Sequence, residues 1–313
     1  MTLGQRNFIL EKFPEIFNTK SKADIFEIIN ALFFLIKTGC QWKLLPNDFP
    51  KWRTVYEFYR KWISIGFFDR LTQELNAMAR DSLRKSAQPT VAVIDSQSVR
   101  TGLTQSVKGI DGGKKIKGIK RHLAVDSNGF PLTIVISRAN VHDSKGAIGL
   151  AIDTVCKYPT IKLLKADNGY RGPLVKNVKE GLLVELECVK SNFGTSEFKP
   201  INGRWVVERT FSWLESFRRL NRNYEQFLHT AKAIAMAVCA MFMLLNSASS
   251  RVHHRHIYSQ LSVAEITIAS ANRHASASAC FGHNATALLP HYANTSARRL
   301  TAPALTNIGE RGL

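Results

Sequence analysis

The 313-residue sequence lacks the cysteine spacings that identify zinc knuckles and disulfide scaffolds. Its five cysteines form no CxxC pair and no framework pattern: Cys40, Cys156, Cys188, Cys239 and Cys280. This usage fits an intracellular, reducing compartment. P-loop, GxGxxG and Ser-His-Asp patterns are missing as well, so none of the sites that those motifs mark is predicted.

Long hydrophobic runs are also missing. The two apolar stretches, residues 25–36 and 233–245, are shorter than the roughly 18 residues that a membrane span needs. Both are predicted to be buried core helices. The first residues show no charged start, apolar run and small-residue cleavage site of a secretory signal. We therefore expect an intracellular protein with no membrane partner.

Acidic residues are scarce relative to basic ones. The chain has 24 Asp and Glu against 43 Lys and Arg, which gives a formal net charge of +19. Such a charge attracts polyanions, because each neutralised phosphate of a nucleic acid releases counterions. A merely soluble basic protein is the alternative, but the basic residues cluster around the motifs described below. DNA is therefore the predicted partner.

Residues 247–313 differ in composition from the rest of the chain. They contain no lysine, six of the nine histidines and no sustained periodicity. We predict a disordered tail, although a reading frame that runs into foreign sequence would give the same composition. The histidines, including His253, His254 and His256, have no second ligand pattern, so a loop is favoured over a metal site.

Residues 1–87 are predicted to form a helical domain. Apolar residues recur at helical spacing over residues 23–38, 54–66 and about 71–83. Two roles fit such a domain equally well: a scaffold for the rest of the chain, or a helix-turn-helix that binds DNA. In the second case three basic side chains would lie near phosphates: Arg53, Arg60 and Lys61.

Residues 88–246 are predicted to form an α/β domain. A strand over 91–94 is followed by a hairpin whose strands, 121–126 and 130–137, flank the turn Ser127-Asn128-Gly129. Helices and strands then alternate, with strands at 161–166 and 182–189 and a long helix from about 203 to 222. Three antiparallel strands followed by this alternation predict an RNase H-like mixed sheet flanked by helices.

Three acidic residues are the candidate catalytic and metal-binding groups. Asp95 and Asp167 are each expected where a buried strand ends, which is where substrate sites of α/β sheets lie. Glu208 is expected on the polar stripe of the long helix. Each has a structural alternative: a turn or cap for either Asp, and exposed i,i+4 pairs, Arg204 with Glu208 and Glu215 with Arg219, for the helix.

Carboxylates from two strands and one helix can converge on hard cations. Mg²⁺ or Mn²⁺ prefers oxygen ligands, and two such ions roughly 3.5–4 Å apart assist in-line phosphoryl displacement. The predicted chemistry is the cutting or joining of DNA. This chemistry needs no protein histidine, so His142-Asp143 and His122 with Asp126 are predicted to make local or supporting hydrogen bonds.

A glycine-rich basic segment, KGIDGGKKIKGIKR, follows the first strand. We predict a flexible loop that neutralises the DNA backbone without reading bases, in preference to a solvated charge run. Its basic residues are Lys108, Lys114, Lys115, Lys117, Lys120 and Arg121. Arg204, one helical turn before Glu208, is predicted to hold a phosphate as well.

Taken together, several ordered motifs resemble those of bacterial DDE transposases of the insertion-sequence-five family. They cover roughly residues 25–246 and include VIDSQSVRTG, GKKIKGIKRHLAVDSNG, ADNGYRG and RWVVERTFSWLESFRRLNRNYE. The resemblance implies an RNase H-like catalytic domain with Asp95, Asp167 and Glu208 as the DDE triad and Mg²⁺ or Mn²⁺ as cofactor. It also implies cleavage at inverted-repeat ends, strand transfer into target DNA, and a homo-oligomer on DNA.

The sequence departs from the wider group's Tyr-x2-Arg-x3-Glu-x6-Lys signature at two positions. Arg204 and Glu208 fit it, but Ile201 stands at the Tyr position and Glu215 at the Lys position. Two alternatives to an active transposase therefore stay open: an inactive DNA-binding remnant, and an RNase H-like nuclease that cuts without joining.

Overall fold

The structure, a computed structural model, describes residues 1–102, 107–171, 173–189 and 205–249. All of them fall in one compact unit that spans Met1–Ile266. The tail predicted for residues 247–313 lies outside the described residues, except for the last positions of one helix.

The N-terminal region is helical, as predicted. It contains α1 (Leu3–Lys12), α2 (Ile25–Thr38), α3 (Trp52–Ser64) and α4 (Phe67–Ser82), with short 3-10 turns between them. The last three match the predicted periodic stretches, whereas α1, with a single buried residue, was not predicted. The Asp24 carboxylate caps α2 by accepting the N–H of Phe26, and Gly39, with φ of 71°, ends that helix.

The rest of the described chain contains a six-stranded mixed sheet. Its strands are β1 (Val91–Arg100), β2 (Gly109–Asp111), β3 (Ile116–Asp126), β4 (Pro131–Arg138), β5 (Leu163–Asp167) and β6 (Glu185–Val189). β3 pairs antiparallel with β1 on one edge and with β2 and β4 on the other, while β5 runs parallel to both β1 and β6. This order confirms the predicted RNase H-like mixed sheet.

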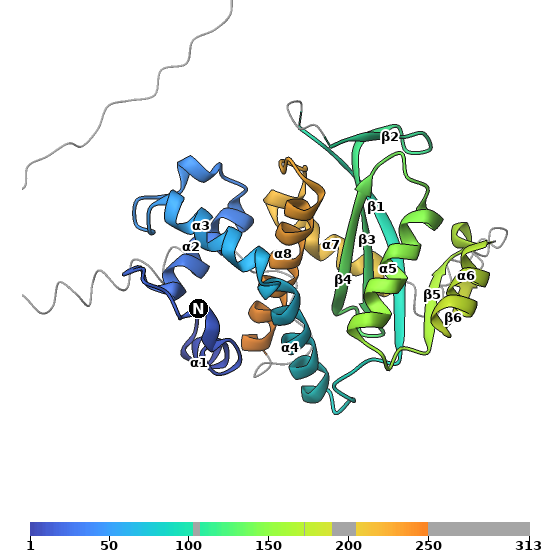
Figure 1. The fold of residues 1–313 in the computed structure, drawn as a ribbon, viewed down its shortest axis with the longest axis horizontal. Coiled ribbons are helices and arrows are strands. Elements are labelled where there is room, and N and C mark those ends of the chain that lie inside the picture. The colour runs from blue at the N-terminus through green and yellow to red at the C-terminus, as the bar shows by residue number, and fades with distance from the viewer. Residues whose placement is uncertain (103–106, 172, 190–204, 250–313) are drawn as a thin grey trace, which may run out of the picture. The chain divides into compact units, whose positions relative to one another are not determined.

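Helices cover both faces of this sheet (Figure 1). α5 (Asp143–Lys157) and α6 (Pro173–Leu182) pack on one face, and α7 (Trp205–Glu215) and α8 (Leu228–Ser249) pack on the other. Alternation along β1 sends Val93 and Val99 toward α7, and Ala92 and Ile94 toward α5. Every residue of β1 is thereby assigned to one of two faces.

The N-terminal helices and the α7 face of the sheet share one hydrophobic core. Trp62 of α3, Phe67 of α4, Leu123 of β3 and Phe217 after α7 are all buried in it. The predicted division between residues 1–87 and 88–246 therefore follows a change in element type, while the core is continuous across it. The separate roles given to the two regions stay predictions.

α8 is the helix that was predicted as buried at residues 233–245. Among the described residues, only Leu228–Asn246 is long and apolar enough to cross a membrane, and 67% of that stretch is buried. It packs against α4, β4 and α7. The apolar sequence of α8 thus belongs to the protein core, as predicted.

β3 and β1 approach each other closely at Gly118. A Cβ atom at this position would lie 1.9 Å from the Val99 carbonyl oxygen, a backbone atom that cannot move aside. We expect Gly118→Ala to lower the free energy of unfolding by at least about 2 kcal/mol, measured by urea denaturation. Gly112→Ala is the matched control, because no atom lies within 4 Å of its Cβ position. Equal effects of the two substitutions would contradict the strand packing.

Candidate functional site

Asp95 lies inside a strand, and the prediction that the strand ends there is wrong. β1 continues to Arg100 because it pairs with β3 along its whole length, with Asp95 opposite Leu123. The pairing of β1 with β5 is shorter and ends at Val93 opposite Lys165. Asp95 therefore sits just beyond the parallel part of the sheet, which opens one edge of β1 at this point.

Asp167 is the last residue of β5, as predicted. Its carboxylate caps the following 3-10 turn, Asn168–Tyr170, by accepting the N–H of Asn168. Continuing the register of β1 and β5 by two residues places Asp167 beside Asp95. Both share the alternation of Val93 and Lys165, so both point toward the face covered by α7. We call these two residues the aspartate pair.

The pKa of Tyr170 reflects the proximity of these carboxylates. Burial, followed by the negative charge of Asp95, raises the pKa of its hydroxyl, and Asp143 and Asp167 raise it further. A hydrogen bond with the Ser96 side chain opposes the rise. Three carboxylates therefore surround one buried phenol at this edge of the sheet.

Glu208 is exposed on α7, the helix that covers the same face as the aspartate pair. The helix packs on the sheet through Val206, Val207, Phe211 and Leu214. Within the described ranges, no three or more His, Cys, Asp or Glu side chains lie together as a metal site. The structure thus brings Asp95 and Asp167 together and does not bring Glu208 into a group with them.

α7 ends at Glu215, so the prediction of one helix to residue 222 is wrong. Phe217 is extended, and a 3-10 turn, Arg218–Leu220, follows it. The Glu215 carboxylate accepts a hydrogen bond of 2.6 Å from the Gln97 amide, and Arg219 pairs with Glu225 at 2.7 Å. The predicted Glu215–Arg219 pair therefore does not form. Arg204 lies outside the described residues.

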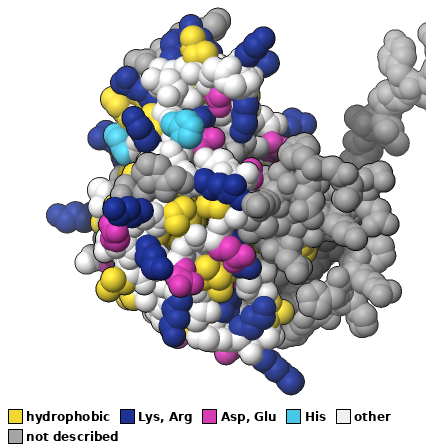
Figure 2. Space-filling view, turned by 90° about the vertical axis from the view of Figure 1, so that its right-hand side faces the viewer, with side chains coloured by type: hydrophobic (Ala, Val, Ile, Leu, Met, Phe, Trp, Pro, Cys, Tyr) yellow, Lys and Arg dark blue, Asp and Glu magenta, His cyan; other side chains and the backbone are white. Residues whose placement is uncertain are grey.

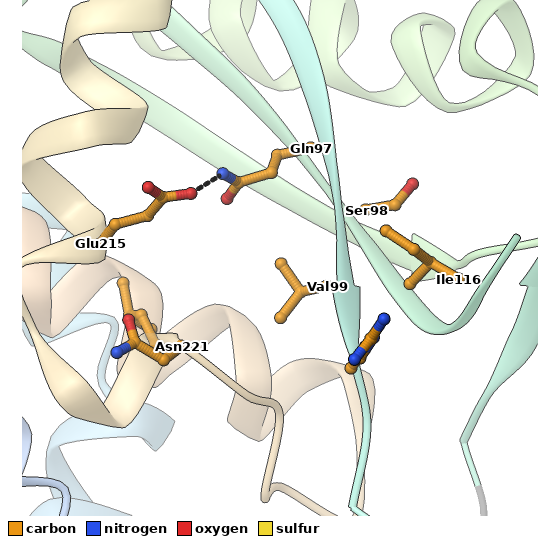
Figure 3. Close-up of a pocket in the computed structure, with 8 residues that line it drawn as sticks. Gln97, Ser98, Val99, Ile116, Glu215 and Asn221 are labelled. Carbon is orange, nitrogen blue, oxygen red and sulfur yellow. Dashed lines mark hydrogen bonds between the residues drawn. The ribbon is translucent and has the colours of Figure 1, made fainter. Parts of the chain in front are cut away.

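A groove of about 440 Å³ runs along β1 on the α7 side. Figure 3 shows Gln97 and Glu215 pointing toward each other from β1 and α7, while Ser98 lies on the other side of the strand. Gln97 is two residues from Asp95 and faces the same way. The groove thus lies along β1 on the face of the sheet that the aspartate pair shares.

The predicted basic loop is a short hairpin formed by β2 and the start of β3. Lys114, Lys115 and Lys117 are exposed on it. Lys120 and Arg121 are 5% and 4% exposed in β3, and their heads are held by Asp143 and by the Leu220 carbonyl oxygen. Buried cations with internal partners are not available to DNA phosphates, so the prediction fails for these two.

The other predicted DNA-binding residues are at the surface. Arg53, Arg60 and Lys61 are exposed on α3, and Lys108 is partly exposed before β2. On the α5 and α6 side of the molecule, Figure 2 shows Lys and Arg spread among acidic and apolar side chains rather than gathered into one patch. Among the described residues of that face, the basic side chains therefore form no concentrated patch.

A family model described as "Transposase DDE domain" matches residues 86–243, just over half of the chain. The chain belongs to this DDE transposase family. A second model, "Putative transposase of IS4/5 family", matches residues 8–72, within the helical region of the chain.

The chain has a relative in Burkholderia cepacia, "Putative transposase for insertion sequence element IS402". The two are 33% identical over 122 residues, which is 35% of this chain and 54% of the relative. The chain thus spans about half the length of the curated relative that it matches.

Solved structures that the chain resembles weakly include an integrase core and a mariner transposase complex. The catalytic core domain of BIV integrase is 12% identical, covers 52% of this chain and 97% of its own, and has a TM-score of 0.32. The Mos1 mariner paired-end complex with Mn is 11% identical, and the match covers 80% of this chain and 86% of the Mos1 chain, with a TM-score of 0.26. At these scores the likeness assigns no chemistry to this chain.

The aspartate pair fits a hard divalent cation by the nature of its donors. Both side chains are partly exposed carboxylates on neighbouring strands, and Mg²⁺ and Mn²⁺ prefer carboxylate oxygens with room for water. Glu208 would have to approach the pair to complete a set of three. The structure therefore brings two of the three predicted ligands together, and the role of all three as metal ligands stays a prediction.

His122 is buried beneath β1 and cannot act as an exposed acid or base. Its Nε2 lies 2.8 Å from Ser137 Oγ, and its ring packs on Gly146 of α5. Burial lowers the pKa of His122 to about 4. This buried ring is a structural group, in line with the supporting role predicted for it.

The low pKa of His122 predicts a loss of stability in mild acid. The unfolded imidazole takes up a proton near its ordinary pKa of 6.5, while the folded one resists protonation until about pH 4. The contribution of the neutral ring to the free energy of unfolding is therefore complete above pH 6.5. As pH falls to 4 this contribution is lost, which lowers the free energy of unfolding by up to about 3 kcal/mol. Urea denaturation across this range should show that slope, and His122→Gln should remove it; an unchanged slope would contradict the assignment.

Proposed function

We propose that this protein is the transposase of a bacterial insertion sequence, cutting DNA at the element's ends and joining those ends to target DNA. The observation that carries the proposal is the aspartate pair on neighbouring parallel strands of a DDE-family sheet. An acid pair in this position can hold a divalent cation against a phosphate, which is what phosphoryl transfer on DNA needs. The family as a whole is generally dependent on divalent metals.

Asp95 and Asp167 would hold the cation, and Glu208 on α7 would supply the third carboxylate. Mg²⁺ or Mn²⁺, when bound, supplies charge for the phosphate and activates the attacking water or 3′-hydroxyl. The Ser96 N–H donates to Asp95 Oδ1 at 2.7 Å, and this bond fixes the orientation of the carboxylate. Gln97 of β1 and Glu215 of α7 border the groove that runs along β1.

We further propose that the exposed lysines of the β2–β3 hairpin bind the DNA backbone, together with Arg204, four residues before Glu208 in the sequence. The α3 side chains Arg53, Arg60 and Lys61 would bind a second stretch of DNA. Joining two ends requires both to be held at once, so a homo-oligomer on DNA is part of the proposal. Action on chromosomal DNA places the protein in the cytoplasm, at the nucleoid.

Cleavage of the element's own flanking DNA ends tests the aspartate pair. With Mg²⁺ present, we expect Asp95→Asn and Asp167→Asn each to slow nicking at least about 100-fold, because each removes a charged ligand. Glu187→Gln is the matched control: this acid lies on the neighbouring strand β6, paired with Lys165 at 3.4 Å, and should keep nicking near wild type. Nicking is measured on labelled DNA by gel electrophoresis.

The products of the same reaction separate the three functions. Target strands covalently joined to element ends identify a transposase, and cut ends without joining identify a nuclease. DNA binding without any Mg²⁺-dependent cut identifies an inactive remnant. Equal nicking by wild type and Asp95→Asn would remove the aspartate pair from the mechanism.

The hairpin lysines give a separate prediction about DNA binding. Replacing Lys114, Lys115 and Lys117 together by Gln should weaken binding to all sequences alike and reduce the slope of log K against log salt by about 2 to 3. Fluorescence anisotropy at several salt concentrations measures this. Lys176→Gln with Lys179→Gln, on exposed positions of α6, is the control and should leave the slope unchanged.

A further inference from the structure

Lys120 places a buried positive charge on the face of the sheet opposite the aspartate pair. Its side chain is 7% exposed and points to the α5 side of β3. Its Nζ lies 2.9 Å from the Val141 carbonyl oxygen, 2.9 Å from Asp143 Oδ1 and 3.5 Å from Asp111 Oδ2. A buried ammonium is costly unless it is paired, and these two carboxylates and one carbonyl provide the pairing.

Two serines of β1 hold the same carboxylates. Ser96 Oγ donates to Asp143 Oδ1 at 2.8 Å, and Ser98 Oγ donates to Asp111 Oδ2 at 2.6 Å. Lys120 therefore joins β1 to the β2 hairpin and to the start of α5. We call Lys120, Asp143 and Ser96 the Lys120 clamp.

The Lys120 clamp contacts the aspartate pair through Ser96. The Ser96 hydroxyl belongs to the clamp on one face of β1, while its N–H donates to Asp95 Oδ1 on the other. The Ser96 side chain also hydrogen-bonds Tyr170, which follows Asp167 by three residues. One residue thus links the backbone positions of both aspartates to the buried ammonium.

We propose that Lys120 is a positioning residue that sets the divalent-cation affinity of the aspartate pair by fixing Ser96 through Asp143. This inference rests on the proposed function, because it takes the aspartates as cation ligands. Partners that orient a metal ligand are worth about 10- to 100-fold in metal affinity. Lys120 lies on the opposite face of the sheet from the aspartates, so it acts on their placement and does not touch the substrate.

Removing Lys120 alone would give a mixed result. Loss of a nearby positive charge favours cation binding, whereas loss of the clamp disfavours it. The double substitution Lys120→Met with Asp143→Asn removes both charges of the pair and keeps net charge constant. Ser96→Ala breaks the link without any change of charge, and Ser96→Thr restores the hydroxyl.

The experiment is calorimetric titration of the full chain with Mn²⁺ in the absence of DNA. We expect the double variant and Ser96→Ala to bind about 10-fold more weakly than wild type, and Ser96→Thr to bind nearly as wild type does. A second readout is the Mg²⁺ concentration for half-maximal nicking, which should rise by the same factor with the rate at saturating Mg²⁺ retained.

The matched control is Lys157→Met with Asp153→Asn. Lys157 Nζ and Asp153 Oδ2 are 3.3 Å apart. Both residues belong to α5, at the far end of the helix from Asp143. Like the double variant, it removes one positive and one negative charge, so it should lower the melting temperature without changing the affinity for Mn²⁺. A similar loss of affinity in this control would show a general effect of destabilisation and would overturn the proposal.

The outcomes also separate this proposal from the proposed function. If wild type binds no Mn²⁺, or if Asp95→Asn binds it as well as wild type, the aspartates are not the ligands and both proposals fail. If Asp95→Asn loses binding while the double variant and Ser96→Ala retain it, only the role of the Lys120 clamp fails. Should the double variant not fold, as judged by circular dichroism, the Ser96→Ala and Ser96→Thr pair decides.

Discussion

The pairing of β1 on both of its edges is the constraint on which the rest of the structure depends. β3 holds the whole strand and β5 holds only its first residues, so the backbone of β1 is fixed while one edge opens near Asp95. Side chains along a strand alternate between faces. Asp95 and Gln97 therefore face α7, and Ser96 and Ser98 face α5, within four consecutive residues.

Charge is buried in this sheet only where it is balanced. Arg121 is fully enclosed, and although burial lowers its pKa to about 10, the nearby Glu215 carboxylate opposes that shift. Glu215 stands where the wider group's signature has a lysine. A lysine there would place a second positive charge beside the buried guanidinium, whereas Glu215 neutralises it and accepts a hydrogen bond from Gln97. Glu215, the residue that departs from the signature, thus has partners within this chain: Arg121 and Gln97.

Local patterns predicted most elements correctly. α2, α3, α4 and α8 follow the spacing of apolar residues, and the β3–β4 hairpin follows Ser127-Asn128-Gly129. The errors share a cause. β1 carries polar residues after Asp95 that resemble a turn, yet they belong to the strand because it pairs with β3 to its end, and Ser96 and Ser98 donate to Asp143 and Asp111 of neighbouring elements. The end of α7 at Glu215 was missed because packing of Phe217 into the shared core sets it.

The sequence by itself determined the order of helices and strands, the acidic residues and the family, because each depends on residues close together in the chain or on whole motifs. Tertiary structure alone decided which basic residues are exposed and which are interior partners. Lys114 and Lys120 lie in one basic run, yet one is exposed in a turn and the other is buried between two carboxylates. The strand pairing and the position of α5 make that distinction, and neither is encoded in the local composition of the run.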